Sequence, residues 1–135
     1  MYTFGKQERL CSKKLIDTLF QSGHRLILFP FSVHWLPCPD GTLPTGIPAQ
    51  VLIATSKKKF RHAVDRNRVK RLTRECYRTH KPHLYDYLNS QGIHIVLSIN
   101  YIHDEILDYH TIQHKFDRLV DNLTQHISEA SLSST

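Results

Sequence analysis

Apolar residues recur along this chain at two spacings, and the spacing distinguishes the expected helices from the expected strands. A first helix is predicted between Ser12, which can cap it, and Gly23, which can end it. Its apolar residues share one helical face: Leu15, Ile16, Leu19 and Phe20. A last helix is predicted after Asp108, and its apolar stripe follows the helical period: Ile112, Phe116, Leu119, Val120, Leu123 and Ile127.

In three other segments apolar residues recur at every second position, and this period of two is typical of β-strands. These segments span residues 26–36, 49–55 and 93–101. Residues 37–48 contain four prolines and two glycines, so we expect a loop there. With a further helix in the basic region described next, the order of elements is helix, strand, strand, helix, strand, helix. This order predicts one mixed sheet with helices packed on it.

Positive charge is concentrated between residues 57 and 81. This window holds eleven of the 18 Lys and Arg residues and two acids, whereas the rest of the chain holds seven basic and ten acidic residues. The window therefore carries a net charge of +9 and the remainder −3. Such a dense patch repels itself unless an anion lies against it, and the commonest partner of this kind is a nucleic-acid backbone.

The basic window is predicted to become helical between Arg61 and Arg66 and to end at 80–82, where Pro82 follows His80 and Lys81. On a helical wheel, Val69, Leu72 and Cys76 fall within about 60° of one another. The opposite side gathers the polar and basic residues Arg66, Asn67, Lys70, Arg71, Arg74 and Arg78. One face is thus suited to docking on the sheet and the other to binding phosphates through planar guanidinium groups.

A solvated charged helix and a leucine-zipper basic region are the alternatives to this interpretation. Solvated helices usually interleave acids with bases at i,i+4, but positions 66, 70, 74 and 78 are all basic. No heptad pattern follows Arg78, which argues against a zipper. The pattern therefore favours an RNA- or DNA-binding face.

Length and composition narrow the class of protein. A chain of 135 residues with 40% apolar content can form one domain with a core, which we place at residues 1–127, leaving 128–135 as a disordered tail. Three cysteines without a CxxC pair indicate neither a disulfide framework nor a zinc site. The N-terminus has no apolar signal region and no run is long enough to span a bilayer, so we expect a cytoplasmic protein.

Ten histidines raise the possibility of a catalytic protein. His110 and His114 have the i,i+4 spacing of a helical metal pair, but they lie away from the apolar stripe and lack the intervening glutamate of zinc proteases. Surface histidines are the better interpretation. Cys76 lies on the docking face of its helix, which predicts packing and not nucleophilic attack. The sequence indicates no catalytic residues.

The run Arg66-Asn67-Arg68-Val69-Lys70-Arg71-Leu72, with Arg74 after it and Ser56-Lys57-Lys58 before it, resembles the signature of the protein subunit of bacterial ribonuclease P. The N-terminal pattern is also similar: Phe4, Lys6, Arg9-Leu10, Leu19-Phe20 and Gly23. The resemblance covers residues 4–123. It implies an α/β sandwich with a four-stranded mixed sheet, three helices and a left-handed βαβ crossover, contrary to the usual handedness. The fourth strand could come from splitting the 25–36 region at Pro30.

The resemblance also implies the function of a ribonuclease P protein. Such a protein assists a catalytic RNA that removes the 5′ leader of precursor tRNA by hydrolysing one phosphodiester bond. The chemistry and the Mg²⁺ belong to the RNA and the substrate, so no cofactor is assigned to protein residues. The implied partners are ribonuclease P RNA and precursor tRNA, without a membrane or DNA.

Two sets of site residues follow from the resemblance. The residues expected to face the RNA subunit are Lys57, Lys58, Arg66, Asn67, Arg68, Lys70, Arg71 and Arg74. The leader-binding cleft, between the first helix and the sheet, is expected to include Ile16, Phe20 and His34. Relatives often carry Phe at position 16 and Tyr at 34, so weaker stacking on leader bases is expected here. For Phe20, burial in the core is an equally good interpretation.

Two other functions stay open at this point. An RNA-binding protein of another assembly, such as a ribosomal protein, would share the basic helix but would not need the leader cleft. A self-sufficient ribonuclease would use histidines and would cleave RNA without an RNA subunit.

Overall fold

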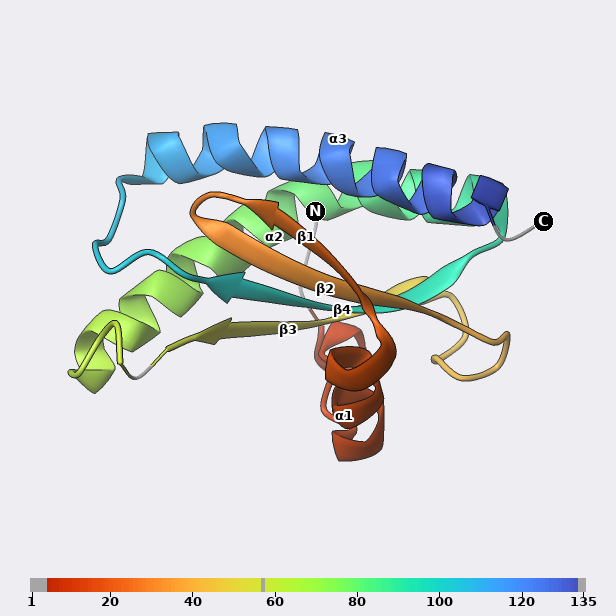
Figure 1. The fold of residues 1–135 in the computed structure, drawn as a ribbon, viewed down its shortest axis with the longest axis horizontal. Coiled ribbons are helices and arrows are strands. Elements are labelled where there is room, and N and C mark those ends of the chain that lie inside the picture. Colours follow the sequence, from red (N-terminus) through yellow and green to blue (C-terminus); the bar gives the residue numbers. More distant parts are fainter. Residues whose placement is uncertain (1–4, 57, 134–135) are drawn as a thin grey trace.

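The computed structural model describes residues 5–56 and 58–133, and in these ranges it contains a four-stranded sheet, three α-helices and a short 3-10 helix (Figure 1). In chain order the elements are η1 (Lys6–Glu8), α1 (Lys13–Ser22), β1 (His24–Leu28), β2 (Phe31–Cys38), β3 (Ala49–Thr55), α2 (Ala63–Gln91), β4 (His94–Tyr101) and α3 (Tyr109–Ser133).

The strands lie in the order β1-β2-β4-β3. β1 pairs with β2 and β2 with β4 in antiparallel fashion, whereas β3 and β4 are parallel neighbours. The mixed four-stranded sheet with three helices is therefore confirmed. Since two parallel neighbours need a crossover connection, the long helix α2 joins β3 to β4. The basic region of the chain is thereby held against an edge of the sheet.

The single alternating run 26–36 forms two strands, separated at a cis Phe29–Pro30 peptide. The expected origin of the fourth strand, a split of this region at Pro30, is therefore confirmed. β2 then runs on to Cys38, two residues into the segment that we expected to be a loop. Pro37 is tolerated in this strand because its missing N–H is not needed there. It pairs with Ile95, whose own N–H donates to the carbonyl of Pro48 on the β3 side. On the other side β1 begins at His24, opposite Trp35, and does not extend as far as Pro37.

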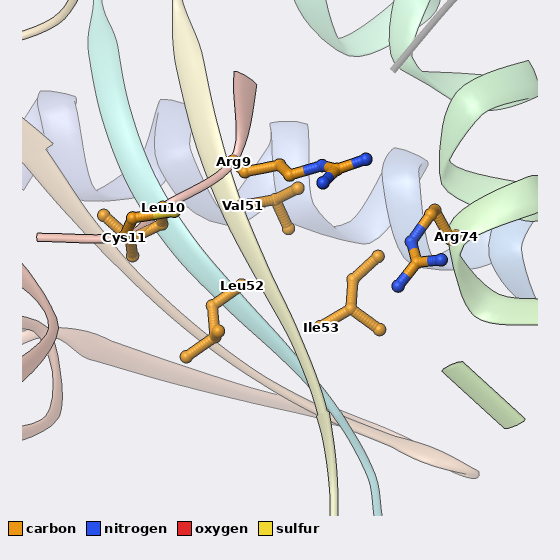
Figure 2. Close-up of a pocket in the computed structure, with 7 residues that line it drawn as sticks. All are labelled: Arg9, Leu10, Cys11, Val51, Leu52, Ile53 and Arg74. Atoms are coloured by element: carbon orange, nitrogen blue, oxygen red, sulfur yellow. The ribbon is translucent and has the colours of Figure 1, made fainter. Parts of the chain in front are cut away.

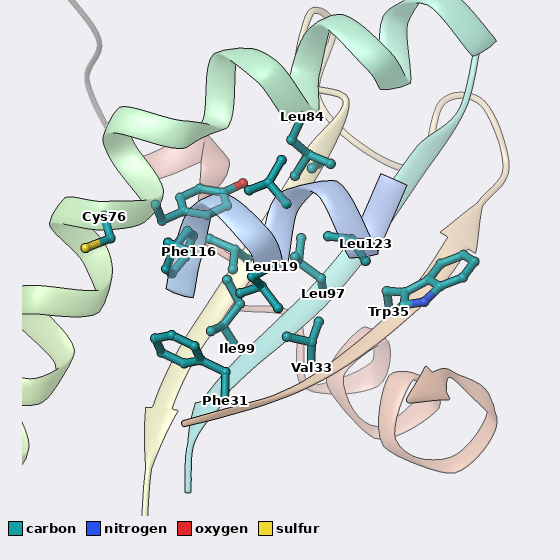
Figure 3. Close-up of a cluster of buried hydrophobic side chains, with 14 of the residues drawn as sticks. Phe31, Val33, Trp35, Cys76, Leu84, Leu97, Ile99, Phe116, Leu119 and Leu123 are labelled. Carbon is teal, nitrogen blue, oxygen red and sulfur yellow. The ribbon is translucent and has the colours of Figure 1, made fainter. Parts of the chain in front are cut away.

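Alternating residues of the sheet point to two cores on opposite faces. On one face, α2 and α3 cover the larger cluster of buried side chains (Figure 3). It includes Phe31, Val33, Trp35, Leu84, Leu97, Ile99, Phe116, Leu119 and Leu123. The other face carries α1 (Figure 1). A smaller cluster of buried side chains lies there, formed by Leu10, Leu19, Leu43 and Val96. The alternation places each strand residue on one of the two faces of the sheet. His34 lies on the α1 face because its neighbours Val33 and Trp35 lie on the other face.

Helix α2 is longer than predicted, and the expected stop at 80–82 is wrong. It continues to Gln91 with Pro82 inside it, and Gly92 ends it in the left-handed conformation (φ 66°). The buried positions continue at helical spacing across the proline, from Lys81 before it to Leu84 and Leu88 after it. Packing of this second half against β3 and α3 outweighs the hydrogen bond that proline removes.

The predicted ends of the other helices are confirmed. The hydroxyl of Ser12 accepts a hydrogen bond from the backbone N–H of Leu15, and Asp108 accepts one from Thr111. Helix α3, however, runs to Ser133, so the tail expected from residue 128 onwards is helical up to that point; residues 134 and 135 lie outside the described part. Ala130 still packs against the larger core, which explains why the helix continues.

None of the described helices is both long enough and apolar enough to cross a membrane.

Candidate nucleic-acid interface

The first half of α2 carries buried residues on one side and basic residues on the other, as predicted. Val69 and Cys76 are buried against the sheet, and Leu72 packs on the same core. The exposed side chains of the opposite face are Asn67, Arg68, Arg71 and Arg74, while Lys70 is half-buried. The hydrophobic face therefore fixes the direction in which the basic row points.

The charges of this row are not neutralised by neighbouring acids. Within residues 5–56 and 58–133, no ion pair involves Arg66, Arg68, Lys70, Arg71 or Arg74. Arg78 is different, because its Nη2 lies 2.5 Å from Oε1 of Glu75. Up to Arg74 the helix thus presents a row of like charges, which an external anion would stabilise.

Arg66 has a structural role in addition to its charge. Its Nη1 donates hydrogen bonds to the carbonyl oxygens of Phe60, at 2.8 Å, and Arg61, at 2.9 Å. These bonds attach the segment before α2 to the first turn of the helix. The exposed Lys58 and Lys59 lie in that segment, where Lys58 donates its N–H to the hydroxyl of Ser56. Lys57 lies outside the described residues, so its predicted role has no structural counterpart here.

A second surface lies where α1 crosses β2. The ring of Phe20 is 46% exposed, so it is not a core residue, and its centroid lies 4.8 Å from that of His34. Burial and the nearby charge of Arg25 both lower the pKa of His34, which favours the neutral ring. Its Nδ1 is buried and has no hydrogen-bond partner among the described residues. The structure therefore brings two of the three predicted cleft residues together as an aromatic pair.

Ile16, the third predicted cleft residue, is only half-exposed. It lies one turn before Phe20 on α1 and packs against the smaller core cluster. The apolar side chain of Ile16 therefore contacts mainly the core of the protein itself. The binding roles of Ile16, Phe20 and His34 stay predictions.

The groups considered for catalysis lie in ordinary structural settings. Cys76 is fully buried, and burial together with the charges of Glu75 and Asp117 raises its pKa to about 12, so the thiol stays protonated. His110 and His114 are exposed on α3. In the described part of the chain, no three His, Cys, Asp or Glu side chains are grouped in a way that could hold a metal ion.

Arg9 is a basic residue of the N-terminal family pattern to which the sequence assigned no binding role. It follows η1 and forms an isolated parallel bridge with Val51, at the outer edge of β3. There it lines a pocket together with Arg74 of the basic helix. Nothing local in the sequence points to this pairing, because the two arginines are 65 positions apart.

Comparison with known proteins agrees with the fold and the motif. The family model described as ribonuclease P matches residues 4–124. The ribonuclease P protein component of Porphyromonas gingivalis is 31% identical over 134 residues, which cover 98% of this chain and 96% of that protein. The protein component of Chlorobium phaeobacteroides is 31% identical over 125 residues, covering 87% of this chain and 86% of that protein.

Solved structures of low sequence identity share the fold. The RNase P protein of Staphylococcus aureus superposes with a TM-score of 0.62 at 20% identity, covering 86% of this chain and 94% of that one. The RNase P protein from Thermotoga maritima gives a TM-score of 0.60 at 20% identity, with coverages of 85% and 96%. On the match of the family model and the identity to its relatives, this chain belongs to the ribonuclease P protein family.

Proposed function

We propose that this chain is the protein component of a ribonuclease P holoenzyme. In this role it binds the catalytic RNA and the 5′ leader of precursor tRNA and assists Mg²⁺-dependent removal of the leader. The observation that carries the proposal is the uncompensated basic face of α2, since the exposed Arg68, Arg71 and Arg74 project from a helix whose other side is buried in the core.

The basic face would bind the phosphates of the RNA subunit. Arg68, Lys70, Arg71 and Arg74 would supply charge-assisted hydrogen bonds, and Asn67 an amide that can donate and accept. Arg66 would act partly by holding the segment that carries Lys58, because its guanidinium is already bonded to the carbonyls of that segment. Hydrolysis would be carried out by the RNA subunit, and Mg²⁺ would be bound by RNA and substrate.

The leader would lie along the α1 face of the sheet. An exposed phenylalanine paired with a neutral imidazole offers two flat surfaces on which unpaired bases can stack. Stacking of this kind contributes about 1–3 kcal/mol per base. Ile16 would add a smaller apolar contact at the side of the groove.

Reconstitution with a bacterial ribonuclease P RNA tests the proposal. Single-turnover cleavage of precursor tRNA is measured at low Mg²⁺ with and without the protein, and RNA alone at high Mg²⁺ serves as the control for correct RNA folding. We expect the protein to increase cleavage at low Mg²⁺. Absence of stimulation with an active RNA, or cleavage by the protein without any RNA subunit, would overturn the proposal.

The leader site has a separate test with a matched control. Phe20→Ala should weaken binding of the holoenzyme to precursor tRNA but not to mature tRNA, because only the precursor has a leader. Phe29→Ala is the control, since Phe29 is similarly exposed (50%) but lies at the turn between β1 and β2. Equal losses for both variants, or equal losses for both RNAs, would contradict leader binding at Phe20.

A further inference from the structure

A pocket of about 170 Å³ lies at the outer edge of β3, between the N-terminal segment and α2 (Figure 2). Its lining residues are Arg9, Leu10, Cys11, Val51, Leu52, Ile53 and Arg74. Two guanidinium groups thus line one small cavity together with aliphatic side chains of the edge strand. Figure 2 shows the guanidinium groups entering from two sides, Arg9 from the N-terminal segment and Arg74 from the helix.

The position of Arg9 is set by contacts on both sides of it in the chain. Glu8, the preceding residue, accepts hydrogen bonds from Nζ of Lys81 at 2.6 Å and from the hydroxyl of Tyr85 at 2.9 Å. Leu10, the following residue, donates its N–H to the carbonyl of Val51 at 2.9 Å. The backbone of Arg9 is therefore held against β3 before any ligand binds, which reduces the entropy cost of binding.

Arg74 is brought to the same place by the helix that anchors Glu8. Lys81 lies seven residues after Arg74, so both project from the same side of α2. While Lys81 binds the N-terminal segment, Arg74 lies two turns earlier, where the pocket opens. Two positive charges facing one space favour an anion between them, and guanidinium forks match the oxygens of a phosphate.

The pocket also lies at the boundary between the two candidate RNA surfaces. Leu10 and Leu52 belong to the core under α1, whereas Val51 and Ile53 pack on the side of α2 and α3. An RNA strand that passes around the outer edge of β3, beside Arg9 and Leu10, would therefore connect the basic face of α2 with the α1 face. A phosphodiester at this edge could accept hydrogen bonds from both guanidinium groups while its sugar contacts the aliphatic side chains.

We propose that Arg9 and Arg74 form a clamp for a single RNA phosphate at the edge of β3. The proposal rests on the function proposed above. It adds a binding residue, Arg9, and extends the binding surface from the basic face of α2 to the edge of β3. The phosphate could belong to the RNA subunit or to the leader of precursor tRNA, and the experiment distinguishes these sources.

The test uses the full chain with Arg9→Gln, Arg74→Gln and the double variant. Dissociation constants for ribonuclease P RNA alone, and for precursor tRNA with the assembled holoenzyme, are measured over a range of salt concentrations. Each single variant should weaken binding about tenfold. The slope of log affinity against log salt should fall by about one in each single variant. It should also fall by about one, not two, in the double variant, because one phosphate is shared.

The controls separate the clamp from general loss of charge. Arg118→Gln removes one positive charge from the exposed side of α3 and should leave the slopes unchanged. Arg9→Lys keeps the charge and should keep the slope while losing part of the affinity. A slope change only with ribonuclease P RNA assigns the phosphate to the RNA subunit, and a change only with precursor tRNA assigns it to the leader.

Three outcomes would overturn the clamp: unchanged slopes in both single variants, a fall of about two in the double variant, or an equal fall in Arg118→Gln. Failure of the proposed function is a different result, namely that the wild-type protein neither binds nor stimulates ribonuclease P RNA. In that case the salt series is repeated with a single-stranded RNA oligonucleotide. A fall of about one unit in the variants would then support the clamp, and no change would overturn it.

Discussion

Nζ of Lys81 lies 2.6 Å from Oε1 of Glu8, and this ion pair joins the N-terminal segment to the middle of α2. The side chains are only 8% and 10% exposed, so the pair is almost completely removed from water. Residues separated by 73 positions are thereby brought into direct contact. The same contact places Arg9 beside the basic helix.

Lys81→Met should destabilise the protein by about 3–5 kcal/mol, because it leaves the carboxylate of Glu8 buried without its cation. Urea unfolding gives the free energy directly. The double variant Glu8→Leu with Lys81→Met should recover most of the loss, since apolar side chains can replace a buried pair. A loss below about 1 kcal/mol in Lys81→Met would mean that water reaches the carboxylate.

Stability should also fall in acid because of Glu8. Burial alone would raise the pKa of this carboxyl, but hydrogen bonds from Lys81, Gly5 and Tyr85 hold it below the ordinary value of 4.5. A lowered pKa in the folded state means that stability is fully present above pH 4.5 and is lost as pH falls through the folded value. The Glu8→Gln variant should melt at a lower temperature than the wild type at pH 7. Its melting temperature should also change less than that of the wild type between pH 5 and pH 3. Parallel pH curves would contradict this assignment.

Gly23→Ala should destabilise the junction between α1 and β1 by about 1–3 kcal/mol. A Cβ at this position would lie 2.3 Å from the carbonyl oxygen of Leu19 and 3.0 Å from that of Trp35, and backbone atoms cannot easily move away. Gly5→Ala is the matched control, because its Cβ would meet its nearest neighbour at 3.7 Å. The midpoints of thermal unfolding of the two variants should differ clearly. Similar midpoints would show that the junction between α1 and β1 adjusts to the added Cβ.

Pro82→Ala should stabilise the protein by about 1–3 kcal/mol. Proline inside α2 cannot donate to the carbonyl of Arg78, whereas alanine restores that bond and has the best helix propensity. Asp86→Ala, at an exposed position of the same helix, controls for propensity alone and should change stability by less than about 0.7 kcal/mol. Equal effects in urea unfolding would mean that the proline costs little in this helix.

Arg66→Ala should loosen the segment before α2, whereas Arg68→Ala should not. Arg66 bonds to the carbonyls of Phe60 and Arg61, whereas Arg68 is exposed on the helix. Hydrogen exchange of the 58–61 amides should accelerate only in Arg66→Ala. Both variants should weaken RNA binding. Hydrogen exchange in the free protein therefore distinguishes the structural role of Arg66 from the effect of its charge. Unchanged exchange in Arg66→Ala would show that its charge alone matters.

The amino-acid sequence by itself determined the elements that depend on local spacing. Period-two runs gave the strands, Ser12, Gly23 and Asp108 marked helix ends, and the wheel around Val69 and Cys76 identified which side of α2 is buried. These features follow from backbone geometry over a few residues, which explains why they can be read without coordinates. The motif around Arg66 also indicated the family.

Tertiary packing decided the features that the spacing of apolar residues along the chain does not determine. Helix α2 passes Pro82, and α3 continues to Ser133, because each finds apolar neighbours in the folded core. The contacts Glu8–Lys81 and Phe20–His34 and the pocket between Arg9 and Arg74 form only when the N-terminal segment and α1 dock on the sheet. Contacts between residues distant in sequence depend on strand order and helix docking, and side-chain periodicity carries no information about either.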